Sequence, residues 1–170
     1  MPRIFFAIEP AEDALRSLAA HAALLARQGG GHPMPADKIH LTLAFLGEVE
    51  DSRIPEAEDA AAAAVGAAFT LVLDRLGAFR RAGVAWAGAS MPDPALLRLQ
   101  GTLAAHLVAR GFELEPRPFA PHVTLVRKVD RAPREAAFEA VSWRVTDFAL
   151  VRSNLATGRY ETLRRWALGE

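Results

Sequence analysis

Residues 40–47, "HLTLAFLG", and residues 122–127, "HVTLVR", share a histidine, an apolar residue, a threonine and a leucine in the same order. Successive side chains of a β-strand point to opposite faces, so each stretch has the alternation of a half-buried strand. Each histidine therefore shares a face with the threonine two positions later. Two such strands can bring their polar faces together if the two halves of the fold oppose each other.

The opposite face of the first strand is apolar. By alternation, Leu41, Leu43 and Phe45 share it, and we expect them to pack against helices. Ala44 falls on the polar face, where its small side chain would leave room for a ligand. A single H-x-T strand also suits the wet face of any half-buried sheet, but two copies, each preceded by a proline-containing segment, favour a functional site.

Arg127 closes the second stretch and raises a question of orientation. Strict alternation places it with Val123 and Leu125, on the face away from His122. It reaches the polar face only at the strand end or through a β-bulge. The alternative interpretation is a surface arginine that ends the strand.

Composition limits the possible classes of protein. The chain has 170 residues, 51% of them hydrophobic, which suits one domain of two small lobes. Twenty basic and twenty acidic residues give no net charge, so an anionic ligand must be held by a local cluster. Cysteine is absent, which excludes disulfides and thiolate chemistry. No stretch is typical of a signal peptide or a membrane span, and we expect a cytoplasmic protein.

The pattern along the chain repeats. A strand, a helix of about 17 residues, a proline-containing segment and an H-x-T strand occur once in each half. This predicts an α+β fold of two pseudo-duplicated lobes, with antiparallel sheets facing a central cleft and helices on the outer faces. The lobes would form a single domain over residues 1–170. The expected strands are 3–10, 39–47, 69–79, 83–90, 122–127, 142–155 and 159–168, and the expected helices are 11–28, 53–68, 94–110 and 133–140.

Two histidines in one cleft suggest acid–base chemistry, because one can accept a proton while the other donates one near neutral pH. Threonine hydroxyls and an arginine would hold the oxygens of a phosphodiester. A zinc site is the main chemical alternative, but a catalytic zinc usually needs three protein ligands and no cluster of that kind is visible. No phosphate-binding loop is present either. We therefore expect no metal and no cofactor.

These motifs carry a family resemblance. The extended "HLTLAFLG", the run "RPFAPHVTLVR", the opening "RIFFAIEP", the strand "GVAWAG" and the late "LVRSNL" followed by "RY" cover nearly the whole chain. The chain resembles the two-histidine phosphoesterase superfamily, and within it the RNA 2′,3′-cyclic phosphodiesterases, historically called 2′-5′ RNA ligases.

The resemblance implies hydrolysis of a 2′,3′-cyclic phosphate at an RNA 3′ end to a 2′-phosphate, without metal or ATP. It also implies reversible 2′-5′ ligation of tRNA halves. Carried over by motif, His40 and His122 are catalytic, and Thr42, Thr124 and Arg127 bind the phosphate. We assign His40 as the acid for the 3′ leaving oxygen and His122 as the base for water, although the symmetry of the motifs leaves the reverse assignment open.

The expected partners are RNA 3′ ends, tRNA halves with a cyclic phosphate, and nucleotides, bound by a monomer that contacts no membrane. The alternatives are a cyclic phosphodiesterase for ADP-ribose 1″,2″-cyclic phosphate or 2′-5′ oligoadenylate, and a non-catalytic nucleotide-binding module. Relatives often have Trp-Val-Pro before the first motif, where this chain has Pro33 and Met34. The remaining candidates for stacking on a base are Phe5, Trp86 and Tyr160. Phe5 and Trp86 also suit a core position.

Overall fold

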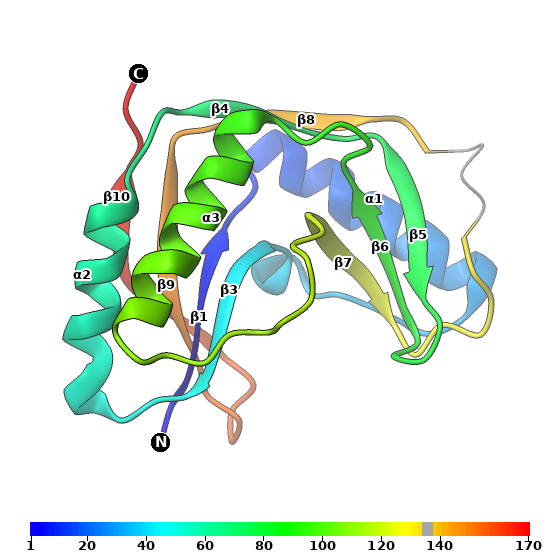
Figure 1. Ribbon diagram of the computed structural model, residues 1–170. Helices are drawn as coiled ribbons and strands as arrows, with labels where there is room; N and C mark the ends of the chain where they lie inside the picture. The colour runs from blue at the N-terminus through cyan, green and yellow to red at the C-terminus, as the bar shows by residue number, and fades with distance from the viewer. Residues whose placement is uncertain (134–137) are drawn as a thin grey trace.

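The structure is a computed structural model that describes residues 1–133 and 138–170 (Figure 1). These residues form an α+β fold with antiparallel sheets, as the sequence pattern predicts. The helices are α1 (Glu12–Gly29), α2 (Ile54–Ala64) and α3 (Pro94–Ala109). The main sheet contains β1 (Arg3–Ile8), β2 (His32–Pro33), β3 (Leu41–Glu48), β5 (Arg75–Phe79), β6 (Val84–Gly88), β7 (His122–Arg127), β9 (Asp147–Ser153) and β10 (Tyr160–Ala167), and a small second sheet pairs β4 (Phe69–Leu73) with β8 (Val141–Val145).

The main sheet has two halves, each with one H-x-T strand. One half has the strand order β10-β9-β1-β3, and the other has β7-β6-β5 with β2 paired to β7. The halves meet where Leu41 of β3 pairs with Val123 of β7. Figure 1 shows the first half on the left and the second on the right. The two-lobed arrangement predicted from the repeated pattern is confirmed.

Each long helix follows a strand of one half of the sheet in the chain but packs on the other half. Helix α1 follows β1 but packs against β7 and β2, while α3 follows β6 and packs against β3, beside α2 (Figure 1). Leu18 of α1 and Leu103 of α3 are fully buried in the same core. This exchange holds the two halves together, because each helix covers the apolar face of the half on which it packs, and moving it away would expose that face to water.

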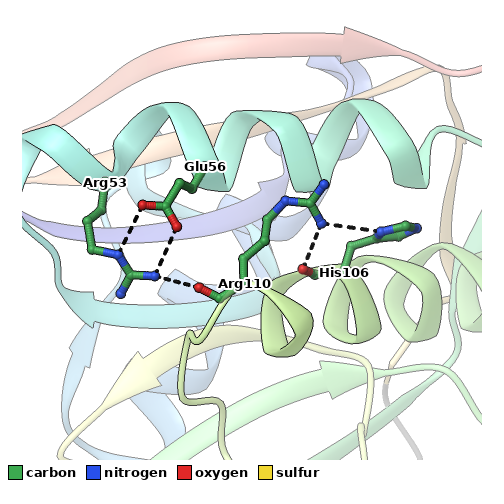
Figure 2. A network of polar contacts seen from close by, with 4 residues as sticks. All are labelled: Arg53, Glu56, His106 and Arg110. Atoms are coloured by element: carbon green, nitrogen blue, oxygen red, sulfur yellow. Dashed lines mark hydrogen bonds and ion pairs between the residues drawn. The ribbon is translucent and has the colours of Figure 1, made fainter.

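Helices α2 and α3 are joined at one end by a polar network (Figure 2). Arg53, just before α2, donates to Glu56 and to the main-chain carbonyl of Arg110, at 2.6 Å from the carbonyl oxygen. Its guanidinium also lies 4.2 Å from the ring centroid of Phe112. Arg110 in turn donates to the carbonyl of His106. These contacts satisfy carbonyls at the C-terminal end of α3, where the helix leaves them without internal partners.

Four expected elements differ from the structure. The stretch 69–79 is two strands in different sheets, with Asp74 between them, and 142–155 divides likewise at Thr146. The helix expected over 53–68 ends at Ala64. The helix expected over 133–140 includes residues 134–137, which lie outside the described part of the chain; residues 133 and 138–140 belong to no helix.

Candidate active site

A β-bulge interrupts the alternation in β3. Thr42 pairs with Ala7 and Ala44 pairs with Phe6, so Leu43 is an extra residue between two ladder pairs. Leu43 and Ala44 consequently both point into the core, and Phe45 turns to the polar face, where 52% of its surface is exposed. The alternation-based placement of Ala44 on the polar face and Phe45 on the apolar face is therefore wrong.

The second H-x-T strand has the same irregularity. Thr124 pairs with Trp86 and Val126 pairs with Ala85, which leaves Leu125 as the extra residue. Leu125 and Val126 are both fully buried, so Arg127 emerges on the polar face. The bulge considered as one route for Arg127 into the cleft is confirmed, and it occurs at the same distance from the histidine as the bulge in β3.

The two polar faces meet in one cleft of about 180 Å³. Both histidines, both threonines and the arginine predicted from the motifs line it, together with Phe5 and Tyr160. Residues separated by 82 positions in the chain (122 minus 40) are thus brought into one site. Its remaining lining residues are Met34, Lys38 and Phe45.

The two imidazoles are held in matching ways. Nδ1 of His40 lies 2.7 Å from the main-chain oxygen of Lys38, and Nδ1 of His122 lies 2.8 Å from that of Ala120. A carbonyl can only accept, so each Nδ1 donates its hydrogen and Nε2 is left to exchange a proton with a ligand. Nε2 of His40 also lies 2.9 Å from the hydroxyl oxygen of Thr42.

Aromatic rings support both histidines. The ring of Phe5 stacks on His40 with 4.9 Å between centroids, and Tyr160 meets the same imidazole edge-on at 5.7 Å. His122 is contacted edge-on by Phe79, with 5.0 Å between ring centroids, and by the tilted ring of Trp86 at 6.3 Å. Only 4% of Phe5 is exposed, so most of its ring is already covered. The base contacts predicted for Phe5 and Tyr160 stay predictions.

The surroundings of His40 favour its neutral form. Burial lowers the pKa of His40 below its ordinary value of 6.5, and Coulombic interactions with Arg127 and His122 lower it further. The hydrogen bond to Lys38 and the negative charge of Glu9 act in the opposite direction and raise it. The carboxylate of Glu9 is itself held by Arg165 at 2.7 Å.

Sequence reasoning missed Phe45, Lys38 and Glu9 as residues near the site. Phe45 stands five positions after His40, as Arg127 stands five after His122, and this matched spacing was an available signal. Lys38 lies just before the first motif and Glu9 just after β1, and no local pattern marks either of them. In the described part of the chain, no three His, Cys, Asp or Glu side chains gather at a possible metal site. No helix there is long and apolar enough to cross a membrane.

The chain matches the model of the 2′-5′ RNA ligase superfamily over residues 8–157. It is 38% identical to the RNA 2′,3′-cyclic phosphodiesterase of Escherichia coli over 98% of its own length and 96% of that protein. It is 31% identical to the Thermus thermophilus protein of the same name, over 90% of this chain and 82% of the relative.

Solved structures agree with the sequence comparisons. The crystal structure of E. coli LigT complexed with 3′-AMP matches with a TM-score of 0.90 and 35% identity, covering all of both chains. The structure of TT0787 of T. thermophilus matches with a TM-score of 0.81 and 32% identity over 99% of each chain. The protein belongs to the 2′-5′ RNA ligase superfamily of two-histidine phosphoesterases. This confirms the resemblance found in the sequence.

Proposed function

We propose that this protein hydrolyses the 2′,3′-cyclic phosphate at an RNA 3′ end and leaves a 2′-phosphate. The observation that carries the proposal is the shared cleft, in which both H-x-T pairs and Arg127 surround one small hollow. Such a constellation supplies a proton donor, a proton acceptor and donors for the phosphoryl oxygens. The names of the E. coli and Thermus relatives point to the same reaction.

In this mechanism water attacks phosphorus while Nε2 of His122 takes one of its protons. The bond between phosphorus and the 3′ oxygen breaks, and Nε2 of His40 gives its proton to that oxygen. Arg127 and the threonine hydroxyls donate to the non-bridging oxygens, where charge accumulates in the transition state. The product carries a 2′-phosphate and a 3′-hydroxyl, and proton exchange with solvent returns both histidines to their starting forms.

His40 is assigned as the acid from its place in the first motif. Burial lowers the pKa of His40 and favours its neutral form in the free protein, while the negative charge of Glu9 acts in the opposite direction. An anionic phosphate bound in the cleft would, like Glu9, favour the imidazolium that the acid role requires. Each proton transfer by a positioned side chain typically contributes about 100- to 10,000-fold to the rate.

Phe45 is the aromatic side chain best placed to stack on the terminal base. It lines the cleft that holds both histidines, and 52% of its surface is open. Base–aromatic stacking is tolerant of sequence because every base has a π-face.

The test is the hydrolysis of adenosine 2′,3′-cyclic phosphate and of a cyclic-ended RNA. Both reactions are run in buffer that contains EDTA, and the products are identified by ³¹P NMR. We expect a 2′-phosphate as the product. No product, or product that requires added metal, contradicts the proposal. Equal or faster turnover of ADP-ribose 1″,2″-cyclic phosphate or of 2′-5′ oligoadenylate would favour those substrates, and tight nucleotide binding without turnover would favour a binding module. The 2′-5′ ligation of tRNA halves, a monomeric state and a cytoplasmic location stay predictions.

A further inference from the structure

The catalytic cleft opens into a larger hollow. This second hollow, of about 420 Å³, shares Lys38, Phe45, Arg127 and Tyr160 with the catalytic cleft. It then continues past them to residues that do not line the catalytic cleft, among them Arg3, His32 and Asn154. A cyclic phosphate held between the two histidines would leave this extension unfilled.

The second hollow is cationic in a chain with no net charge. Arg3, Lys38 and Arg127 line the second hollow, and none of the described residues that line it is an aspartate or a glutamate. In residues 1–133 and 138–170, none of these three cations forms an ion pair. A group of like charges in a concave site focuses the field and attracts an anion.

Strand β1 places the outermost of these cations in line with the catalytic histidine. Side chains alternate along β1, so Arg3 and Phe5 share the face that looks into the cleft. Phe5 stacks on His40. Arg3 therefore lies two residues, roughly 7 Å along the strand, beyond the ring that supports the imidazole.

Apolar surface accompanies the cations. Phe45 is 52% exposed and Leu155 is 65% exposed, and both line the second hollow. Leu155 belongs to the turn after β9, which is held by Asn154, whose side-chain oxygen accepts from the amides of Ala156 and Thr157. Cations combined with exposed rings and apolar side chains are typical of sites for single-stranded nucleic acid.

We propose that this extension, the upstream subsite formed by Arg3, His32, Lys38 and Asn154, binds the phosphate on the 5′ side of the terminal nucleotide. The inference rests on the proposed function, since it concerns the same cleft and the same substrate end. It names the substrate class as RNA ends that carry at least one phosphate besides the cyclic one. A cyclic mononucleoside phosphate without a 5′-phosphate would leave the subsite empty.

The test compares adenosine 2′,3′-cyclic phosphate with its 5′-phosphorylated form, because the two differ by one phosphate. We expect wild-type kcat/KM at low ionic strength to be about three- to fivefold higher for the 5′-phosphorylated substrate, the effect typical of an exposed charge pair. Arg3→Gln should bring that ratio close to one. Arg98→Gln, which removes an exposed arginine on α3 away from the cleft, should keep the wild-type ratio.

A wild-type ratio of one, or an equal loss with both substrates in Arg3→Gln, overturns the upstream subsite. If wild-type protein hydrolyses neither substrate, the proposed function fails. The upstream subsite is then tested by measuring ligand binding instead of hydrolysis. The ligands are then adenosine 2′-phosphate and adenosine 2′,5′-bisphosphate, measured by calorimetry in wild type and Arg3→Gln. A Kd ratio that favours the bisphosphate and disappears in Arg3→Gln supports the subsite, and equal affinities overturn it.

Discussion

Leu43 and Leu125 occupy the same place in the two H-x-T strands: each is the extra residue of a β-bulge, three positions after the histidine. Each bulge turns the following residue into the core and the one after it into the cleft. The pair Phe45 and Arg127 is the outcome. One half of the pseudo-duplicated fold thus offers an aromatic platform where the other offers a cation, although the backbone device is the same.

Phe45→Ala should weaken binding of the terminal nucleoside. Stacking on an exposed ring is worth about 1–3 kcal/mol per base, so we expect KM for adenosine 2′,3′-cyclic phosphate to rise at least fivefold while kcat changes little. Steady-state kinetics measure both values. Leu97→Ala, at an exposed apolar position on α3, is the matched control and should match wild type. A loss confined to kcat would place Phe45 in a different role.

Gly77→Ala on β5 should disturb His122 on β7 through Trp86 of β6, the strand that lies between them. A Cβ added at Gly77 would overlap the indole ring of Trp86, which contacts the imidazole of His122. Because the indole must move, we expect a several-fold fall in kcat and a loss of about 1–3 kcal/mol in stability. Kinetics and thermal unfolding report the two effects.

The control for that substitution is Gly101→Ala in α3. A Cβ at Gly101 meets no atom within 4 Å. It should raise stability by up to about 1 kcal/mol, through helix propensity, with wild-type kcat. If Gly77→Ala behaves like Gly101→Ala, the close packing of Trp86 does not position His122.

These packing details mark the limit of what the sequence could predict. The H-x-T strands and their shared polar face follow from local patterns. The start of α3 is also locally encoded, because Asp93 is a residue type that caps helices and its side chain accepts from the amide of Ala95. The division of 69–79 at Asp74 and of 142–155 at Thr146 does not, because both halves of each stretch favour strands. Partners far away in the chain decide it: β4 pairs with β8, while β5 and β9 join the main sheet.

The bulge in β3 escaped prediction for the same reason, and the bulge in β7 was only one of two routes open to Arg127. Strict alternation is a property of one strand, whereas a bulge is a mismatch in number between two paired strands. Nothing in "HLTLAFLG" alone shows that Ala44 and Phe45 exchange faces. Their exchange depends on the pairing of Thr42 with Ala7 and of Ala44 with Phe6.

His40 should make stability depend on pH in a defined direction. Burial lowers its pKa in the folded state below the ordinary value of 6.5, so the unfolded chain binds a proton at a higher pH than the folded protein does. The stabilisation from neutral His40 is complete above pH 6.5, and it is lost as the pH falls through the pKa of His40 in the folded protein. Between pH 7 and pH 5, the Tm of the wild type should therefore fall more steeply than the Tm of His40→Gln. Parallel curves would contradict the lowered pKa.

Two neighbouring charges should move the same titration in opposite directions. Glu9→Gln removes a negative charge that raises the pKa of His40, so its NMR titration midpoint should fall. Arg127→Gln removes a positive charge that lowers it, so the midpoint should rise. If the titration midpoint of His40 moves in the opposite direction in either variant, the effect assigned to that charge is contradicted.

The most direct test of the paired-histidine site is single-turnover hydrolysis of a cyclic-ended RNA in EDTA by wild type, His40→Ala and His122→Ala. We expect a 2′-phosphate product with wild type and a rate at least about 100-fold lower in each variant, with binding of the 2′-phosphate product largely retained. His21→Ala, a histidine on α1 that contacts Phe138, is the control and should keep the wild-type rate. Wild-type rates in both cleft variants would contradict the assignment of His40 and His122 as the catalytic pair.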